Sequence, residues 1–133
     1  MTPRLRVVAA AIFDVAGRVL IAQRPEGKHM AGWWEFPGGK VANGESDGDA
    51  LVRELREELG VETQPGEHLM TLEHQYPDRH VELALWRATI TRGEPRGLDG
   101  QRIKWIECRE LGNEKLLEAD RPFVEKLQSV STF

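Results

Sequence analysis

The stretch GKVANGESDGDALVRELREELGV, residues 39–61, decides the fold because it carries the clearest helix signature in the chain. Within it, Ser46 is placed to cap a helix, with an acidic residue three positions on, and Gly60 is placed to end it. Four apolar residues repeat at helical spacing on one face, and they are Leu51, Val52, Leu55 and Leu59. We therefore predict a helix over residues 46–60 that packs through its leucines.

The predicted helix also gathers three glutamates, Glu54, Glu57 and Glu58, on a neighbouring face. Residues three and four apart are neighbours on a helix surface, so each like-charge pair costs about 0.2–0.5 kcal/mol. One interpretation is a solvated surface whose repulsion is offset by Arg53 and Arg56. The other is that cations outside the helix offset this repulsion.

Two features favour the cation interpretation. The glutamates border the apolar face of the helix, so we expect them at the edge of the interior rather than on the far solvent side. The glycine-rich FPGGK, residues 36–40, precedes them, and backbone carbonyls of such a loop can approach an ion because glycine adds no side-chain bulk. Ligand sets made only of oxygen suit hard cations. The sequence therefore predicts bound Mg²⁺, with Mn²⁺ as the alternative ion.

The net charge of −4 is concentrated in the same stretch. Residues 45–60 hold six acidic residues and two arginines, and the rest of the chain is neutral. No basic stripe remains to follow a nucleic-acid backbone, which argues against a DNA or RNA polymer as the partner. An acidic helix that carries divalent cations can instead attract a polyphosphate, and the cations can activate a water for attack on phosphorus.

The segments around the helix contain apolar runs separated by turn residues. Residues 4–13 and 18–24 are predicted as a strand pair joined by a tight turn at DVAGR, and residues 25–44 as a loop rich in glycine and aromatic residues. Residues 68–76 and 80–90 flank PDR and are predicted as a hairpin.

The last third of the chain predicts one more strand and a final helix. Residues 101–107 form the strand, with Cys108 as a half-buried residue at its end. Asp120 is placed to cap the helix with Pro122 in its first turn. Its inward-facing residues are expected to be Phe123, Val124 and Leu127. The order of strands, helix, strands and helix predicts an α/β sandwich with a mixed β-sheet.

Composition predicts one ordinary globular domain over residues 1–133, since hydrophobic residues make up 40% and charged residues 30%. The single cysteine excludes an intramolecular disulfide and fits a reducing compartment. Arg4 and Arg6 precede VVAAAIF in the order of a signal peptide. That run is too short to span a bilayer, and an interior strand accounts for it. The expected location is the cytoplasm, without membrane association.

Residues 39–61 also match G-x5-E-x7-R-E-U-x-E-E-x-G-U, where U is apolar, at all nine specified positions. The chain thereby resembles the Nudix family. The resemblance implies a Nudix α/β/α sandwich and metal-dependent hydrolysis of a nucleoside diphosphate linked to another group. It implies that Glu54, Glu57 and Glu58 bind the metals with a backbone carbonyl of Gly38 or Gly39.

Within this box, the resemblance implies that Arg53 orients a catalytic glutamate. Glu45 has two implied roles, which are to hold the box together or to contact an outer metal. A role of Glu45 as an acidic group near the start of the helix is equally compatible with the sequence.

Outside the box, the chain is similar to the MutT-type subgroup, the sanitising nucleoside triphosphate pyrophosphatases. The matching pieces are QRP at residues 23–25, HMA with EFPGGK within residues 29–40, PDRH at residues 77–80, and GEP at residues 93–95 with a following acid, Asp99. In that subgroup water attacks the β-phosphorus and releases a nucleoside monophosphate and pyrophosphate.

The subgroup resemblance implies phosphate contacts for Arg24 and Lys40, although both are also compatible with solvated charges. Asp99 would be a further metal ligand or would position the attacking water. The subgroup has glutamate at that position, so the shorter side chain puts direct ligation in doubt, and a plain turn residue is the alternative. Trp33 and Trp34 either line a base pocket or cover the core.

Five residues are assigned to substrate binding around the base by the subgroup pattern, and they are Phe36, Tyr76, Asp78, Arg79 and Asp120. Members specific for 8-oxo-dGTP have asparagine where this chain has Asp120. An ionised aspartate can only accept hydrogen bonds, which suits the amine of cytosine, unless burial raises its pKa so that it keeps a proton. A purely structural helix cap remains the alternative for Asp120.

The predicted function is therefore hydrolysis of 8-oxo-dGTP, with CTP, 5-methyl-dCTP or a broad set of triphosphates as the alternative. A non-catalytic nucleotide sensor is a remote alternative, because the box keeps all its carboxylates. The expected partner is a small-molecule nucleoside triphosphate. The protein is expected to be a monomer or a weak dimer.

Overall fold

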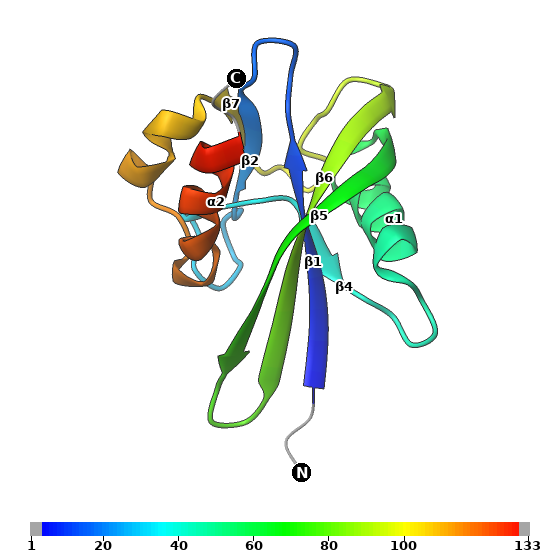
Figure 1. Cartoon of the computed structure of the whole chain (residues 1–133), viewed down its shortest axis with the longest axis vertical. Coiled ribbons are helices and arrows are strands. Elements are labelled where there is room, and N and C mark those ends of the chain that lie inside the picture. Colours follow the sequence, from blue (N-terminus) through cyan, green and yellow to red (C-terminus); the bar gives the residue numbers. More distant parts are fainter. Residues whose placement is uncertain (1–3, 131–133) are drawn as a thin grey trace.

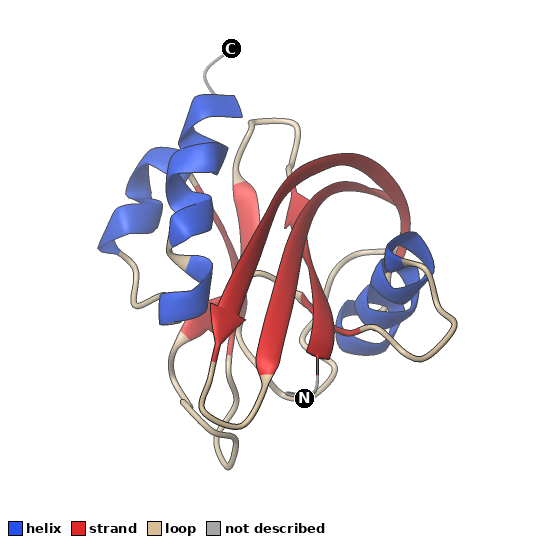
Figure 2. Cartoon of the chain, turned by 60° about the horizontal axis from the view of Figure 1, so that its bottom comes forward, coloured by secondary structure: helices blue, strands red, loops and turns tan. Residues whose placement is uncertain are grey.

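The computed structural model describes residues 4–130, so residues 1–3 and 131–133 of the predicted domain lie outside the described residues. Two helices lie on opposite sides of the strands, as Figures 1 and 2 show. The elements are β1 (Arg4–Ile12), β2 (Val19–Gln23), β3 (Trp34–Glu35), β4 (Gly38–Lys40), α1 (Asp47–Leu59), β5 (Glu62–Gln75), β6 (His80–Arg92), β7 (Ile103–Ile106), the 3-10 helices η1 (Cys108–Asn113) and η2 (Glu118–Asp120), and α2 (Pro122–Val130). The predicted α/β sandwich is confirmed.

The strands form two sheets rather than one. The larger sheet has the order β4-β1-β6-β5, with β1 parallel to β6 and the other pairs antiparallel, so the predicted mixed sheet is confirmed. The smaller sheet has the order β3-β2-β7 and is antiparallel. The predicted pairing of the first two strands was wrong, because β1 and β2 belong to different sheets. The turn between them is closed by an isolated bridge between Phe13 and Val19 and by the hydrogen bond from the Asp14 N–H to the Arg18 carbonyl.

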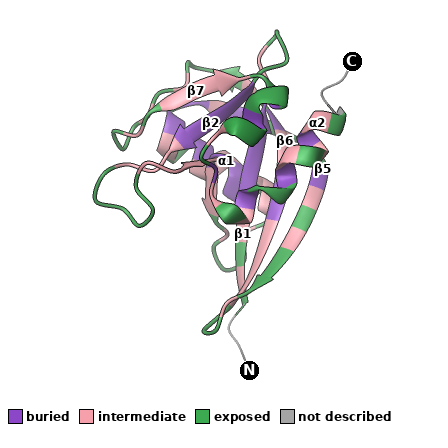
Figure 3. Ribbon diagram, turned by 90° about the vertical axis from the view of Figure 1, so that its left-hand side faces the viewer, coloured by how far each residue is buried: buried purple, intermediate pink, exposed green. Residues whose placement is uncertain are grey.

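Strand β1 lies between two hydrophobic clusters because its side chains alternate between the faces of the sheet. Ala9 and Ala11 face a cluster that includes Phe123 and Leu127 of α2. Val8, Ala10 and Ile12 face a second cluster that includes the leucines of α1. Figure 3 shows this buried centre between more exposed outer elements.

Helix α1 has the predicted caps and the predicted apolar face. Ser46 Oγ accepts a hydrogen bond from the backbone N–H of Asp49 at 3.1 Å. Gly60 ends the helix in the left-handed conformation with φ 71°, where its N–H donates to the carbonyl of Arg56. Three leucines of the face, Leu51, Leu55 and Leu59, are 0% exposed, whereas Val52 is only half-buried.

The predicted loop over residues 25–44 is wrong in part, because it contains the short strands β3 and β4. The predicted hairpin is confirmed, although β5 begins at Glu62 and contains register shifts. The predicted strand over residues 101–107 is confirmed as β7. No helix within residues 4–130 has the length and apolar content needed to cross a bilayer.

Two predictions about the last third of the chain were wrong. Cys108 is buried at the start of η1 instead of half-buried in a strand, because the chain turns inward after β7. Asp120 ends η2, and its carboxylate accepts a hydrogen bond from the backbone N–H of Phe36 instead of capping α2. The inward positions of Phe123 and Leu127 are confirmed, and Val124 packs against the same cluster.

Candidate active site

The acidic face of α1 meets strand β4 at the edge of the larger sheet. Glu58 Oε2 accepts a hydrogen bond from the backbone N–H of Gly38 at 3.2 Å. The Glu54 carboxyl packs directly over Gly39, where an added Cβ would overlap it. Glu57 lies further out at an exposed position. The structure therefore places the glycine-rich segment against Glu54 and Glu58 but not against Glu57.

Arg53 links these glutamates to the turn before the helix. Its Nε and Nη2 donate to the two carboxylate oxygens of Glu45 at 2.8 and 2.9 Å, and Nη2 also donates to the Lys40 carbonyl at 2.9 Å. Its Nη1 donates to Glu54 at 3.0 Å and approaches Glu57 at 3.4 Å. The hydrogen bonds from Arg53 hold the pKa of Glu45 at about 2. This geometry favours the role of Glu45 in holding the box together.

Burial raises the pKa of Glu58 to about 8, against the opposing effect of the Gly38 N–H. Three neighbouring carboxylates, those of Glu35, Glu54 and Asp99, contribute to this rise. Burial also raises the pKa of Glu54, although Arg53 opposes that shift. The fold therefore crowds the carboxylates of Glu35, Glu54 and Asp99 around Glu58.

Asp99 reaches this cluster because its loop closes the carboxyl end of α1. The backbone N–H of Leu98 donates to the Glu58 carbonyl at 3.0 Å, and Gln101 Nε2 donates to the same carbonyl at 3.2 Å. Gln101 Oε1 in turn accepts from the backbone N–H of Asp99 at 2.8 Å. The loop thus satisfies a carbonyl that a helix end leaves without a partner.

A central cleft of about 360 Å³ adjoins this cluster, with Gly38 and Gly39 in its lining. Its walls include Val7 and Ala9 of β1, Tyr76 at the end of the hairpin, and Ala119 of η2. Glu58 and Lys40 also line it. Asp120 and Phe36 form part of the wall, and the distance from Asp120 Oδ2 to the backbone nitrogen of Phe36 is 3.0 Å.

Asp120 is 6% exposed, and burial raises its pKa to about 7, although the Phe36 N–H opposes the shift. The neighbouring charge of Glu35 contributes to this rise. Both protonation states of this carboxyl are therefore populated near neutral pH, so that it can donate or accept a hydrogen bond.

Arg24 lies between the central cleft and a smaller cavity of about 150 Å³ that Glu58 and Asp99 also line. Its Nη1 pairs with Glu35 Oε2 at 3.2 Å, and its Nε donates to the His29 carbonyl at 2.6 Å. Arg24 is therefore held at the carboxylate cluster, whereas Lys40 is exposed at the rim. The two cavities share Arg24, Glu35 and Glu58.

Comparison with known proteins decides the family. The NUDIX domain model matches residues 8–126. The chain belongs to the Nudix family. This Nudix protein is 35% identical over 125 residues to an 8-oxo-dGTP diphosphatase of Escherichia coli (strain K12), covering 94% of this chain and 97% of that protein. It is 38% identical over 123 residues to a CTP pyrophosphohydrolase of the same strain, covering 92% of this chain and 91% of that protein.

Solved structures agree with this assignment. The solution structure of the E. coli ORF135 protein matches the Nudix chain with a TM-score of 0.86 and 36% identity, covering 98% of this chain and 93% of that one. The crystal structure of a MutT protein from Methanosarcina mazei Go1 matches with a TM-score of 0.85 and 25% identity, covering 99% and 98%. The Nudix fold and the MutT-type resemblance are confirmed, and the chain is a hydrolase of phosphoanhydride bonds.

Nudix hydrolases use divalent metal ions, and the donor set of this Nudix protein fits them. Within residues 4–130, no three His, Cys, Asp or Glu side chains already converge on one point. Glu54 and Glu57 turn toward Arg53, and Glu58 turns toward the Gly38 N–H. The chemistry nevertheless suits a hard cation, because the crowded groups offer only oxygen and their charges raise the pKa of Glu58.

Three predicted substrate residues lie on the hairpin of the Nudix protein, and the structure brings two of them to the cleft. Tyr76 and Arg79 line it, with the Arg79 guanidinium 5.5 Å from the centre of the Tyr76 ring. Asp78 is exposed at the turn and is not among the residues that line the cleft. Trp34 packs against the core, and Trp33 lies under Lys115.

The sequence interpretation of the Nudix protein missed Glu35 and Gln101. Glu35 lies inside the EFPGGK stretch that supported the subgroup, and its partner Arg24 was already assigned. An acid next to assigned residues was therefore a signal that could have been used. Gln101 had no such signal, because its role depends on how its loop folds back onto α1.

Replacing Gly39 by alanine should separate activity from stability. A Cβ there would push the Glu54 carboxyl away, and this is a flexible group that can move at small cost. We expect a fall in kcat of at least about tenfold with a small change in melting temperature. Steady-state kinetics and thermal unfolding measure the two effects.

Gly38→Ala is the matched control for this experiment. A Cβ at Gly38, where φ is 154°, would strike the backbone of Val8 in the neighbouring strand. Backbone cannot move aside as a side chain can, so this variant should lose stability as well as activity. Equal loss of stability in both variants would contradict the assigned contact between Gly39 and Glu54.

Proposed function

We propose that this Nudix hydrolase is a metal-dependent nucleoside triphosphate pyrophosphohydrolase that acts on oxidised guanine nucleotides such as 8-oxo-dGTP. One observation carries the proposal, namely that the carboxylate cluster around Glu58 opens onto a cleft whose wall contains Asp120. Cations held by the carboxylate cluster can bind the polyphosphate of a nucleotide, and the buried carboxyl of Asp120 can contact its base. The E. coli relative named 8-oxo-dGTP diphosphatase supports this substrate class.

Glu54, Glu57, Glu58 and Asp99 would hold Mg²⁺ together with a backbone carbonyl of Gly38 or Gly39. The ion would supply neutralisation of the polyphosphate charge and acidification of a bound water. Arg24 and Lys40, at the carboxylate end of the cleft, contact the phosphates. The backbone N–H of Leu98 and the side-chain amide of Gln101 hold the Asp99 loop against the end of α1 near Glu58.

Water attacks the β-phosphorus and forms a new bond there while the bond to the oxygen bridging the α- and β-phosphorus atoms breaks. The products are a nucleoside monophosphate and pyrophosphate. Arg53 holds Glu54 at 3.0 Å, closer than Glu57 at 3.4 Å, so we assign Glu54 as the glutamate that takes the water proton. The role of Arg53 is to orient that carboxylate.

Asp120 discriminates between bases in this proposal. With its proton retained, the carboxyl can donate to the O6 of 8-oxoguanine. Once ionised, the Asp120 carboxylate can accept a hydrogen bond from the exocyclic amine of cytosine. This ability favours CTP or 5-methyl-dCTP as the second candidate substrate. The E. coli relative named CTP pyrophosphohydrolase is in line with that alternative. With a pKa of about 7, Asp120 can take the protonation state that suits either base near neutral pH.

The proposal is tested by kcat/KM values for 8-oxo-dGTP, dGTP, CTP, 5-methyl-dCTP and 2-hydroxy-dATP. We expect the highest value for 8-oxo-dGTP, release of pyrophosphate, activity with Mg²⁺ or Mn²⁺, and none after chelation. Single-turnover pyrophosphate release would exclude a non-catalytic sensor. A highest value for CTP or 5-methyl-dCTP would replace the leading substrate by the alternative, and phosphate as the product would overturn the reaction.

A further inference from the structure

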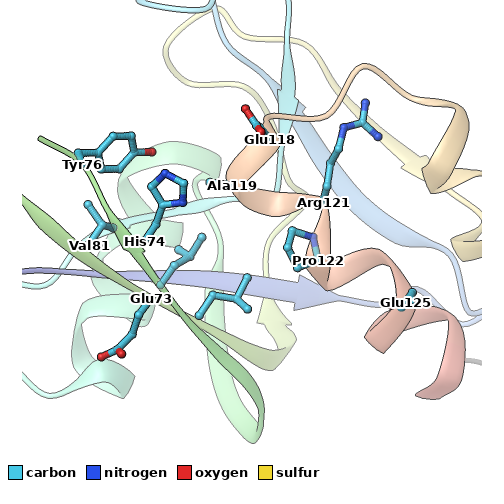
Figure 4. Close-up of a pocket in the computed structure, with 11 residues that line it drawn as sticks. Glu73, His74, Tyr76, Val81, Glu118, Ala119, Arg121, Pro122 and Glu125 are labelled. Carbon is cyan, nitrogen blue, oxygen red and sulfur yellow. The ribbon is translucent and has the colours of Figure 1, made fainter.

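A second cavity of about 600 Å³ lies beside the central cleft, between the hairpin and the start of α2 (Figure 4). Its lining includes the apolar residues Leu72, Leu83 and Pro122. The His74 ring lies against the Tyr76 ring, with their centres 4.4 Å apart. We call this space the outer cavity. None of the proposed catalytic steps uses it.

The outer cavity and the central cleft lie on the same face of the larger sheet, and η2 borders both of them. Two rows of paired residues cross one face of the sheet from β1 through β6 to β5, and they are Leu5, Val81 and His74 in one row and Val7, Leu83 and Leu72 in the other. The cleft is lined by the β1 and β6 members and the outer cavity by the β6 and β5 members. Ala119 of η2 lines both. The two spaces are therefore neighbouring compartments of one trench.

The charges around the outer cavity restrict what it can hold. Two glutamates, Glu118 and Glu125, line it together with Arg121, whereas the carboxylate of Glu73 pairs with Arg4 at 3.1 Å on the opposite face of the sheet from Leu72 and His74. This acidic rim disfavours a phosphate, which therefore belongs at the Arg24 end of the cleft. The apolar floor instead suits an uncharged hydrophobic group.

The chemistry of a nucleotide indicates what could reach this cavity. In adenine and cytosine the exocyclic nitrogen lies on the edge of the ring remote from the sugar. When the phosphates lie near Glu58 and the base near Asp120, a group attached to that nitrogen extends beyond the base. Because Val81 and Leu83 line both compartments, this substituent would lie over them and reach the outer cavity.

We propose that the outer cavity accepts a hydrophobic substituent on the exocyclic nitrogen of the base, so that the substrates include N-alkylated and N-arylated nucleoside triphosphates. This inference rests on the proposed function and extends its substrate class. Hydrolysis removes such a nucleotide from the triphosphate pool by the same attack at the β-phosphorus. The substituent itself takes no part in the reaction.

The test compares N6-benzyl-dATP with dATP and N4-benzyl-dCTP with dCTP. For the wild type, we expect kcat/KM of at least one benzylated nucleotide to be within about tenfold of its parent. His74→Trp places a larger ring in the outer cavity, and it should lower that ratio by at least about tenfold. Thr71→Trp, at an exposed position of β5 outside the cavity lining, is the matched control and should leave the ratio unchanged.

Binding of the monophosphates by calorimetry separates the inference from the proposed reaction. The benzylated monophosphate should bind the wild type at least as tightly as its parent and should bind the His74→Trp variant more weakly. Failure to hydrolyse any parent triphosphate, with this binding pattern intact, would sink the proposed function alone. Weaker binding of both benzylated monophosphates to the wild type, or an equal effect of the two tryptophan variants, would overturn the outer-cavity proposal.

Discussion

Glu57→Gln is expected to lower kcat by at least about 100-fold while the fold stays intact. Changing a residue that only supports a metal ligand already lowers metal affinity or activity by about 10- to 100-fold, and Glu57 is proposed as a ligand itself. Glu57 is exposed on α1, and its carboxylate reaches Arg53 Nη1 at 3.4 Å. Glutamine has almost the same shape and helix propensity, so it removes the anionic ligand and little else. The melting temperature without metal should therefore stay close to that of the wild type.

The same variant should respond less to metal. A ligand that binds only the folded state stabilises it by about 2.7 kcal/mol at a concentration 100 times its Kd. Thermal unfolding with and without Mg²⁺ should show this gain in the wild type and a smaller one in Glu57→Gln. The exposed Glu67 of β5 provides the control, since Glu67→Gln changes the same net charge outside the site. Activity of Glu57→Gln within about threefold of the wild type would remove Glu57 from the metal set.

Asp120→Asn is expected to raise the ratio of kcat/KM for 8-oxo-dGTP to that for CTP, by about ten- to 100-fold at alkaline pH. Asparagine can keep the hydrogen bond from the Phe36 N–H through its side-chain oxygen. Its amide nitrogen then faces the cleft as a donor, which suits the O6 of guanine and opposes the amine of cytosine. The difference from the wild type should shrink below pH 7, where Asp120 itself is protonated.

Stability gives an independent measure of Asp120. Its pKa in the folded protein is about 7, against an ordinary value of 3.8, so the folded state keeps a proton that the unfolded state releases between these two values. The contribution of Asp120 to the free energy of unfolding therefore falls as pH rises from about 4 to about 7, by at most about 1.4 kcal/mol per pH unit. Asp120→Asn should remove this part of the pH dependence in denaturant titrations.

The two outcomes together decide the role of Asp120. A changed pH dependence of stability with an unchanged substrate ratio would show that Asp120 only holds Phe36. A changed ratio in the direction of CTP would contradict the assignment of asparagine as the better partner of oxidised guanine. In both measurements, Glu118→Gln, a change at the first residue of η2, controls for the loss of one negative charge nearby.

The sequence predicted α1 well because its determinants are local. Ser46, the leucines and Gly60 act within a few turns of one another, and each lies where expected. The division of the strands between two sheets could not be predicted, because an apolar run indicates a strand without indicating its partner. β1 and β2 therefore looked like a pair although their main partners are β6 and β7.

The candidate site was predictable to the extent that it depends on a continuous motif. Glu45 and Arg53 belong to the matched box, and the structure joins them directly. The contact between Asp120 and Phe36 spans 84 positions, and nothing local to either residue indicates it. The same reason explains why the sequence favoured a helix cap as the structural role of Asp120.

The two faces of β1 carry a consequence for how such proteins diversify. Val8, Ala10 and Ile12 pack on the side of α1, which carries the proposed metal ligands, whereas Val7 and Ala9 line the cleft that we propose for the base. Substitutions can accumulate on the second face while the first is left untouched, so that selection can change which nucleotide is taken without rebuilding the hydrolytic apparatus. Two E. coli relatives of similar identity to this chain but with differently named substrates are what such independent variation would produce.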